Sequence, residues 1–398
     1  MSLRPESETV AMVWSFLLDR GVSPDEIHQA ELDHTLHLLV LEHIVLPEPL
    51  KYTPLQVAEI VGMSIEEVRQ YWRSLGFPDV ADDKVAFTDR DVEALTTLSG
   101  LLRFRMVDEG VAVQMGRVIG SSMARIAEAE ITSSPVLAGR ADDLHRSELF
   151  IETADATLPS LARLLEYAWR RHLQVAARRG TLLKAAHDVD SPATADLAVG
   201  FADLVGFTAL SQQLSDRALA DVVGHFEEVA FDIVVRAGGR VVKMIGDEAM
   251  FVCESVADAV RIGLELADAF GSDDALSEVR VGIACGPVLP REGDYFGPVV
   301  NMASRIVNIA NPGSVVVSGS VHDALADDPS FTWKSLRTRY LKEIGRVPLW
   351  AAMPPEEEAD EREPRRGRRR RLRPGVLEVI NELQRVGAEA VEQARKDV

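Results

Sequence analysis

Two acidic residues stand at positions where carboxylates can hold a metal ion. Asp203 ends an apolar run within residues 199–208 (VGFADLVGFT), which predicts a buried strand that leads through Gly206 into a helix. Asp247 lies in the tripeptide 246–248 (GDE) between two short apolar runs, which predicts the tip of a hairpin. A strand-end carboxylate beside a helix N-terminus suits a cation bridged to a polyphosphate, because the acid binds the cation and the N–H groups face the anion.

A mixed order of elements surrounds these two residues. Residues 208–236 carry apolar residues at helical spacing, and the glycines at 238–239 end that helix. Further helices are expected at 255–270 and 299–309, and strands at 240–245, 249–253, 279–285 and 315–317. We therefore expect an α+β sheet of ferredoxin-like type with helices packed on one face.

Four segments of this region resemble the catalytic domain of class III adenylyl cyclases, in the order typical of that family. They are residues 201–208 (FADLVGFT), 243–251 (KMIGDEAMF), 293–306 (GDYFGPVVNMASRI) and 341–350 (LKEIGRVPLW). Together with the helical first half, the layout is similar to that of the soluble pH-sensing adenylyl cyclases of actinobacteria. The resemblance implies a ferredoxin-like class III cyclase domain preceded by a mostly helical regulatory domain.

The resemblance implies that Asp203 and Asp247 hold two divalent cations per site, either Mg²⁺ or Mn²⁺. In this reaction the ribose 3′-oxygen of ATP attacks the α-phosphorus and expels pyrophosphate, which yields 3′,5′-cyclic AMP. Divalent cations lower the pKa of that hydroxyl and offset charge on the leaving group. Carboxylate oxygens are suitable ligands for hard cations of this kind.

The resemblance also implies that Lys243 and Asp294 select adenine. Lysine only donates hydrogen bonds, so it suits a ring-nitrogen acceptor, and aspartate only accepts them, so it suits the exocyclic amine. Guanine presents a carbonyl where adenine has the amine, and a mispaired buried polar group gives strong discrimination. We therefore expect ATP rather than GTP as the substrate.

Two further residues are spaced to act together on the reacting phosphate. Asn301 and Arg305 lie one turn apart on an expected helix, so they share a face. By resemblance, the asparagine orients the ribose and the arginine stabilises the charge that grows on the phosphate. The backbone N–H groups of Gly206, Phe207 and Thr208 are expected to cradle the triphosphate.

The two sets of site residues imply a dimer. In the family, the metal-binding carboxylates and the other site residues come from opposite subunits. One chain here holds both sets but only one cyclase domain, so the resemblance implies a head-to-tail homodimer with two shared sites. Lys342 is a further candidate for a phosphate contact; the family often has glycine after this lysine, and Glu343 follows it here.

Composition bounds the class of protein. The chain has 398 residues, 46% of them hydrophobic, so it can bury a large core in two or three domains. The net charge of −20 disfavours nucleic acid and anionic membranes outside a local basic patch. Cys253 and Cys285 lie in apolar runs, which favours a reducing compartment without disulfides. No apolar run is long enough to cross a bilayer and no secretory signal pattern is present, so we expect a cytoplasmic protein.

The first half of the chain predicts helices, including a helix-turn-helix pattern. Residues 53–56 (TPLQ) and 64–67 (SIEE) form capping boxes on either side of Gly62, which resembles the helix-turn-helix half of MerR-type regulators. Between 51 and 95, nine acidic residues outnumber five basic ones, which disfavours contact with DNA phosphates. We expect a structural or regulatory module; a non-enzymatic nucleotide sensor, or a DNA-binding regulator using this segment, is the alternative to the enzyme.

These patterns predict four parts of the chain. They are a helical regulatory (autoinhibitory) domain at 1–146, a helical connector at 147–195, a cyclase domain at 196–352 and a charged, disordered tail at 353–398. Histidines cluster in the first helices, at His28, His34, His37 and His43. Because histidine titrates near neutral pH, and because of the resemblance, we expect pH to be a regulatory signal.

Overall fold

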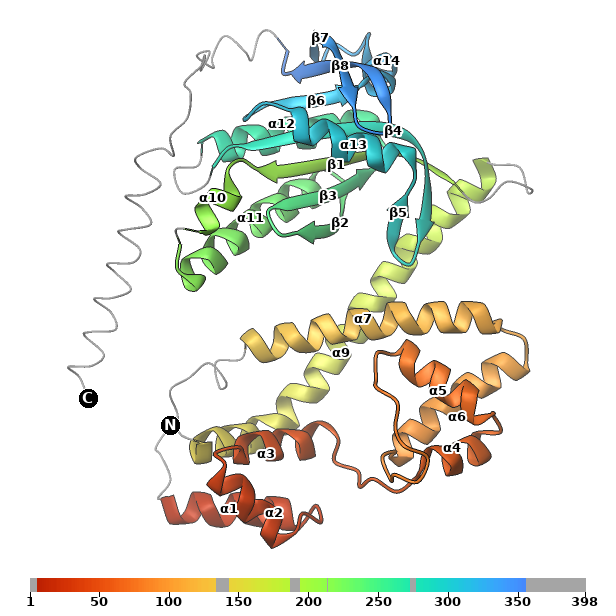
Figure 1. Ribbon diagram of the computed structural model, residues 1–398, viewed down its shortest axis with the longest axis vertical. Coiled ribbons are helices and arrows are strands. Elements are labelled where there is room, and N and C mark those ends of the chain that lie inside the picture. Colours follow the sequence, from red (N-terminus) through yellow and green to blue (C-terminus); the bar gives the residue numbers. More distant parts are fainter. Residues whose placement is uncertain (1–5, 134–142, 187–193, 213, 273–276, 356–398) are drawn as a thin grey trace, which may run out of the picture. The chain divides into compact units, whose positions relative to one another are not determined.

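The computed structural model describes residues 6–133, 143–186, 194–212, 214–272 and 277–355 (Figure 1). Contacts divide the chain into two compact units, Met1–Leu182 and Leu183–Val398, and each is described by itself. Most of the predicted tail and the end of the predicted connector, at 187–193, lie outside the described residues.

The first unit is built from helices, as expected (Figure 1). They are α1 (Glu6–Leu18), α2 (Pro24–Leu32), α3 (Leu36–Val45), α4 (Pro54–Val61), α5 (Ile65–Ser74), α6 (Asp89–Arg103), α7 (Glu109–Ser133) and α9 (Asp143–Ala186). Apolar side chains of α1, α2, α3 and the start of α9 form one core, and those of α4, α5, α6 and α7 form another.

Both predicted capping boxes are present around the turn between α4 and α5. Thr53 accepts a hydrogen bond from the backbone N–H of Gln56, Ser64 accepts one from that of Glu67, and Gly62 ends α4 with a left-handed φ of 68°. The basic side chains nearby pair with acidic ones of the same unit: Lys51–Asp89, Arg69–Asp82, Arg73–Asp79 and Arg90–Glu48. These pairs favour a structural role for the module over contact with a polyanion.

A single mixed sheet forms the centre of the second unit. Its order is β2-β3-β1-β4-β6-β8-β7, with β5 paired to β4. The strands are β1 (Ala195–Leu204), β2 (Arg240–Ile245), β3 (Glu248–Cys253), β4 (Val279–Arg291), β5 (Asp294–Phe296), β6 (Val315–Ser318), β7 (Thr332–Leu341) and β8 (Gly345–Met353). The helices are α10 (Phe207–Ser211), α11 (Asp216–Arg236), α12 (Val256–Ser272), α13 (Pro298–Ile309) and α14 (Gly319–Leu325).

Helices cover both faces of this sheet, so the expectation of helices on one face is wrong. Ala198 and Ala202 of β1 belong to the core that includes α11 and α12, whereas Val199 and Phe201 belong to the cluster that includes α13. The physical reason is that β1 is apolar on both sides and is buried along nearly its whole length. A strand of that kind requires cover on both faces. We call the side covered by α13 the α13 face.

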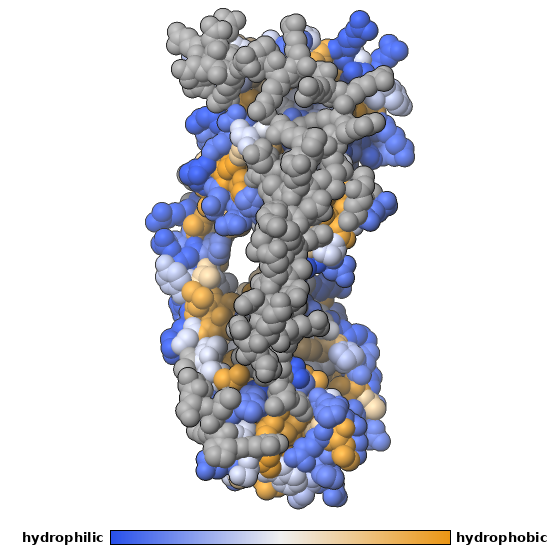
Figure 2. All heavy atoms as spheres, turned by 90° about the vertical axis from the view of Figure 1, so that its left-hand side faces the viewer, coloured by the Kyte–Doolittle hydropathy of each residue, from blue (hydrophilic) through white to orange (hydrophobic). Residues whose placement is uncertain are grey.

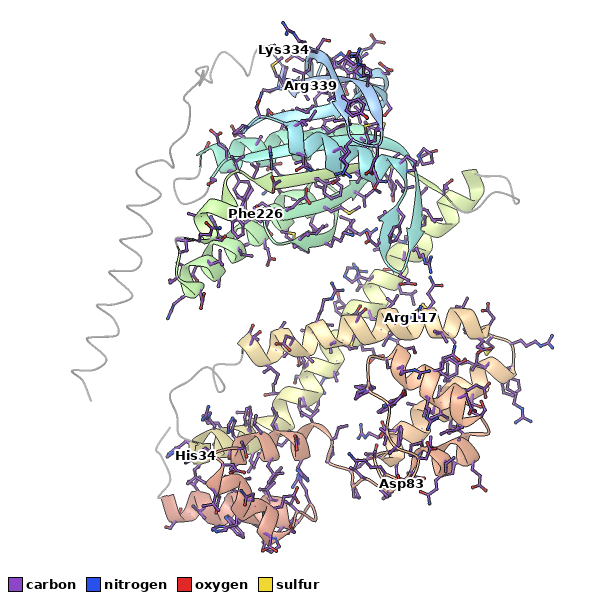
Figure 3. The ribbon with its side chains drawn as sticks, viewed as in Figure 1. His34, Asp83, Arg117, Phe226, Lys334 and Arg339 are labelled. Atoms are coloured by element: carbon purple, nitrogen blue, oxygen red, sulfur yellow. The ribbon has the colours of Figure 1, made fainter. Side chains whose placement is uncertain are left out.

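The helix expected at 208–236 is two helices. A short α10 is followed by a break, and Ser215 then begins α11 by accepting a hydrogen bond from the backbone N–H of Ala218 at 3.3 Å. Phe226, labelled in Figure 3, is fully buried on α11 and lies 5.5 Å from the ring of Phe270 on α12. Truncating such a phenylalanine to alanine typically costs about 3–5 kcal/mol, so this contact anchors both helices to the sheet.

The helix α13 lies very close to β4 because Gly282 has no side chain. A Cβ atom at Gly282 would lie 2.3 Å from the backbone nitrogen of Val307 and 2.7 Å from the carbonyl oxygen of Ala303. Both of those atoms belong to the backbone of α13, so they cannot move aside as a flexible side chain would. The glycine therefore sets the depth at which α13 packs on the sheet.

Figure 2 shows a mainly hydrophilic surface on the face that it draws, with apolar side chains in separate orange patches. Within the described residues, no helix has both the length and the apolar character of a membrane span. Both cysteines are free thiols, and burial raises the pKa of Cys253 to about 12. That thiol is therefore a packing residue and stays protonated at neutral pH.

Candidate active site

The first part of the site is a cluster of charges where β1 ends. Asp203 lies directly opposite Glu248 on β3 and Arg280 on β4. Residues paired in this way share a face of the sheet, and alternation along β1 places this group on the α13 face. Atoms Nε and Nη2 of Arg280 both lie 2.5 Å from Oδ2 of Asp203, whose side chain is only 13% exposed.

Asp247 joins this cluster from the hairpin between β2 and β3, as predicted. Its carbonyl oxygen accepts a hydrogen bond from the backbone N–H of Leu204 at 3.0 Å, which holds the hairpin tip against the end of β1. Gly246 supplies the left-handed φ of 63° that the turn requires. The tip and the strand end therefore bring the carboxylates of Asp247 and Asp203 together.

The carboxyl groups of this cluster repel one another. Burial, followed by the charge of Asp203, raises the pKa of Asp247. Burial, followed by the charges of Asp203 and Asp247, raises the pKa of Glu248 to about 7, although Arg280 opposes the shift. A cation among these oxygens would relieve the repulsion.

The donor set fits a hard divalent cation. It offers carboxylate oxygens without a competing sulfur or imidazole, which is the chemistry that Mg²⁺ and Mn²⁺ prefer. Among the described residues, no group of three or more His, Cys, Asp and Glu side chains has an arrangement that could hold a metal ion. A cation bound by Asp203 and Asp247 would therefore take its other ligands from water and from phosphate oxygens.

The second part of the site joins β2 to β5. Lys243 Nζ donates a hydrogen bond to Oδ2 of Asp294, and the two side chains form an ion pair. Oδ1 of Asp294 accepts a hydrogen bond from the backbone N–H of Tyr295 at 2.8 Å. Lys243 is opposite Met250, which belongs to the cluster on the α13 face, so this pair lies on the same face as Asp203.

The third part of the site is on α13 and the hairpin between β7 and β8. Asn301 is exposed in the first turn of α13, and Arg305 lies one turn later. Nη2 of Arg305 is 3.7 Å from Oε2 of Glu343, and the Lys342 side chain beside it is 79% exposed. Glu343 has a left-handed φ of 68°, a conformation that glycine adopts without strain.

The predicted phosphate cradle lies at the start of α10. Gly206 is the N-cap of that helix with a φ of 79°, and the backbones of Phe207 and Thr208 form its first turn. The Phe207 side chain packs against the core of the second unit. The segment follows Asp203 directly, so its backbone N–H groups lie beside the acidic cluster.

The sequence interpretation missed Arg280 and Glu248. Both are ordinary strand residues by type, in the segments VRVGI and DEAMF. What assigns them to the site is the register that places each one opposite Asp203. The available signal was a charged residue at the start of an apolar strand, as Glu248 and Arg280 each are.

The comparisons with known proteins cover both units. Residues 189–351 match the family described as the adenylate and guanylate cyclase catalytic domain, and residues 6–169 match the adenylate cyclase regulatory domain. An adenylate cyclase of Streptomyces coelicolor is 38% identical over 76% of this chain and 76% of its own length. One of Streptomyces griseus is 37% identical over 73% and 74%. A pH-sensitive adenylate cyclase of Mycobacterium tuberculosis is 28% identical over 84% and 85%.

The fold and the charged clusters define a nucleotide cyclase catalytic unit that follows a helical regulatory unit in the chain. With these relatives, the chain belongs to the adenylate cyclase family. The predicted resemblance, the α+β cyclase fold and the class of enzyme are therefore confirmed.

Proposed function

We propose that this chain converts ATP to 3′,5′-cyclic AMP and pyrophosphate, with Asp203 and Asp247 as ligands of two Mg²⁺ or Mn²⁺ ions. The observation that carries the proposal is the crowding of partly buried carboxyl groups at the end of β1, where burial and then mutual repulsion raise the pKa of Asp247 and of Glu248. When bound, divalent cations would activate the ribose 3′-hydroxyl and neutralise the pyrophosphate.

Arg280 supports phosphate binding in this proposal. Its guanidinium forms an ion pair with Asp203 at 2.5 Å. If Asp203 held a cation, the planar donors of Arg280 would be well suited to bind phosphate oxygens beside it. The N–H groups of Gly206, Phe207 and Thr208 bind the remaining phosphate oxygens, and Lys342 reaches them from an exposed hairpin.

Lys243 and Asp294 select the base by exchanging partners. The two side chains form an ion pair, and both keep some exposure, 37% and 27%. Adenine replaces that contact with two matched ones, in which Lys243 donates to a ring nitrogen and Asp294 accepts from the exocyclic amine. Guanine would leave the carboxylate of Asp294 facing a carbonyl, so GTP is a poor substrate.

Asn301 and Arg305 complete the site across a head-to-tail homodimer. Asn301 orients the ribose, and Arg305 stabilises the charge that develops on the α-phosphate. Support for a second subunit comes from apolar side chains at hairpin ends of the catalytic unit, where Ile245, Leu289 and Phe296 are 47%, 43% and 49% exposed. A subunit interface would bury side chains of this kind.

We further propose a cytoplasmic enzyme whose regulatory domain controls the cyclase domain, with pH as one signal. Support comes from the similarity to a relative named pH-sensitive and from histidines in the first helices. His28 lies 3.4 Å from Glu31, and His43 Nδ1 lies 3.0 Å from the carbonyl oxygen of Leu39. The first contact is an ion pair only when the histidine is protonated.

Product formation by the full chain tests the proposal. We expect cyclic AMP from ATP in the presence of Mg²⁺ or Mn²⁺, much less cyclic GMP from GTP, and no product with a chelator. Activity measured between about pH 5.5 and 8, around the ordinary histidine pKa, tests the regulatory part. No cyclic AMP with either metal at any of these pH values would refute the proposed activity.

A further inference from the structure

A second contact between β2 and β5 lies beside the Lys243–Asp294 pair. Nη2 of Arg240 donates a hydrogen bond to the hydroxyl of Tyr295, and the guanidinium carbon is 5.1 Å from the centre of the tyrosine ring. The ring itself packs against the apolar cluster of the α13 face. Two neighbouring contacts therefore connect the same two strands.

A β-bulge makes this arrangement possible. Arg240 and Lys243 are three residues apart, so in a regular strand they would point to opposite faces. The register instead shifts between Val241 and Lys243, which leaves Val242 as the extra residue of a bulge. As a result, Arg240 lies opposite Val252 and Lys243 lies opposite Met250. Both partners belong to the cluster on the α13 face, so both basic side chains lie on that face.

The strand β5 has little backbone support of its own. It contains three residues and pairs only with β4, where Pro290 lies opposite Tyr295. This ladder is limited to three residue pairs. The side-chain contacts to β2 therefore contribute a large part of what holds β5 in place.

The position of Tyr295 fixes the orientation of Asp294. The backbone N–H of Tyr295 donates to Oδ1 of Asp294 at 2.8 Å, which leaves Oδ2 for Lys243. Within the described residues, Nε of Arg240 is buried without a hydrogen-bond partner. The hydroxyl of Tyr295 thus accepts a hydrogen bond from a guanidinium that has few other partners. Loss of either group would therefore leave the position of the other less well fixed.

We propose that Arg240 and Tyr295 are positioning residues that set the separation of Lys243 and Asp294, and through it the preference for ATP over GTP. The inference rests on the proposed function, because it takes Lys243 and Asp294 as the residues that read the base. Arg240 and Tyr295 act through these two residues rather than by touching the nucleotide.

Kinetics of the full chain with ATP and with GTP test the inference. Tyr295→Phe keeps the ring and removes the hydroxyl, and Arg240→Met keeps an unbranched apolar side chain and removes the donors. We expect each variant to lower kcat/KM for ATP about fivefold, the effect of one lost hydrogen bond. The loss appears mainly in KM and is much smaller for GTP, so the ATP/GTP preference falls.

The double variant and a conservative variant sharpen the test. Arg240→Met with Tyr295→Phe is expected to lose no more than either single change, because both remove one contact. Arg240→Lys keeps a donor and is expected to recover part of the preference. Arg236→Met is the control, since Arg236 pairs with Glu265 on the outer surface of the helices, and its nucleotide preference is expected to equal that of the wild type.

Two results would overturn the inference while the proposed function stands. One is a wild-type ATP/GTP preference in Tyr295→Phe and Arg240→Met. The other is an equal fall in kcat for both nucleotides, which indicates general loss of structure. A wild-type chain that makes cyclic AMP and cyclic GMP equally well refutes the proposed base selection, and this inference fails with it.

Discussion

The two charged clusters of the catalytic unit are built in opposite ways. At the end of β1, Asp203, Asp247 and Glu248 gather around a single guanidinium, so negative charge is in excess. Between β2 and β5, Lys243 and Asp294 neutralise each other. A cation would stabilise the first cluster, whereas the second would have to give up an existing contact in order to bind a ligand.

This opposite arrangement of charge indicates what each cluster would contribute to the reaction. A group of mutually repelling carboxylates concentrates cations whatever nucleotide is present. A paired donor and acceptor separate only for a ligand that offers a matching acceptor and donor. Such a pair therefore discriminates between ligands by their hydrogen-bond pattern. We therefore propose that the acidic cluster sets the rate and that the Lys243–Asp294 pair sets the nucleotide preference, and the following changes separate the two effects.

Neutralising one carboxylate of the acidic cluster should have the largest effect on activity. Asp247→Asn keeps the shape of the side chain but weakens cation binding, and we expect kcat/KM for ATP to fall about 1,000-fold, since a catalytic cation contributes several kcal/mol. Steady-state kinetics at several Mg²⁺ concentrations measure the change. Asp258→Asn is the control, because Asp258 pairs with Arg261 on α12 away from the site. A change of less than tenfold in Asp247→Asn would contradict the assignment.

Breaking the Lys243–Asp294 pair should have a smaller effect on the rate with ATP but a large effect on the preference for ATP over GTP. Lys243→Met removes the donor and leaves Asp294 without its ion-pair partner, so we expect the ATP/GTP preference to fall roughly 100-fold. Competition between the two nucleotides measures this directly. Lys334→Met is a suitable control, because Lys334 is an exposed lysine on β7 (Figure 3). An unchanged preference in Lys243→Met would show that base selection lies elsewhere.

Mixing inactive subunits tests whether the acidic cluster and Arg305 work together across a dimer. Asp203→Ala and Arg305→Ala are each expected to be inactive alone. In an equal mixture, half of the dimers are mixed and one of their two shared sites is intact, so about a quarter of the wild-type activity should return. Activity against mixing ratio is the measurement. If the mixture is no more active than the single variants, each site is contained within one chain.

The pH dependence of stability should differ with and without cation. The folded-state pKa of Glu248, about 7, lies above the ordinary 4.5, so its contribution to stability is present below about pH 4.5 and is lost as the pH rises through 7. We expect the Tm of the cation-free chain to fall by a few degrees over this range, and less in Glu248→Gln. Added Mg²⁺ should raise the Tm more at about pH 7.5 than at about pH 5. Parallel profiles for wild type and variant would contradict this.

The features that the sequence predicted correctly are those that depend on neighbouring residues. The capping boxes at Thr53 and Ser64 and the hairpin tip at Asp247 depend on residues within a few positions of one another. They are present because capping and turn formation involve no distant part of the chain.

Features that depend on strand register could not be predicted in this way. Arg280 meets Asp203 from 77 positions away, and nothing in either segment specifies that alignment. The bulge at Val242 reverses the side to which Lys243 points relative to a regular strand. The cover on both faces of the sheet similarly depends on where α13 packs, which a single helical pattern does not specify.

The absence of a side chain at Gly282 has a consequence for how the enzyme can be altered. Because α13 rests on backbone at that position, any larger residue would lift the helix from β4 and carry Asn301 and Arg305 with it. In the proposed dimer these two residues act together with Asp203 of the partner subunit, so their distance from the proposed cation site would change. Gly282, which lies beneath α13, thus determines where the residues on that helix are placed.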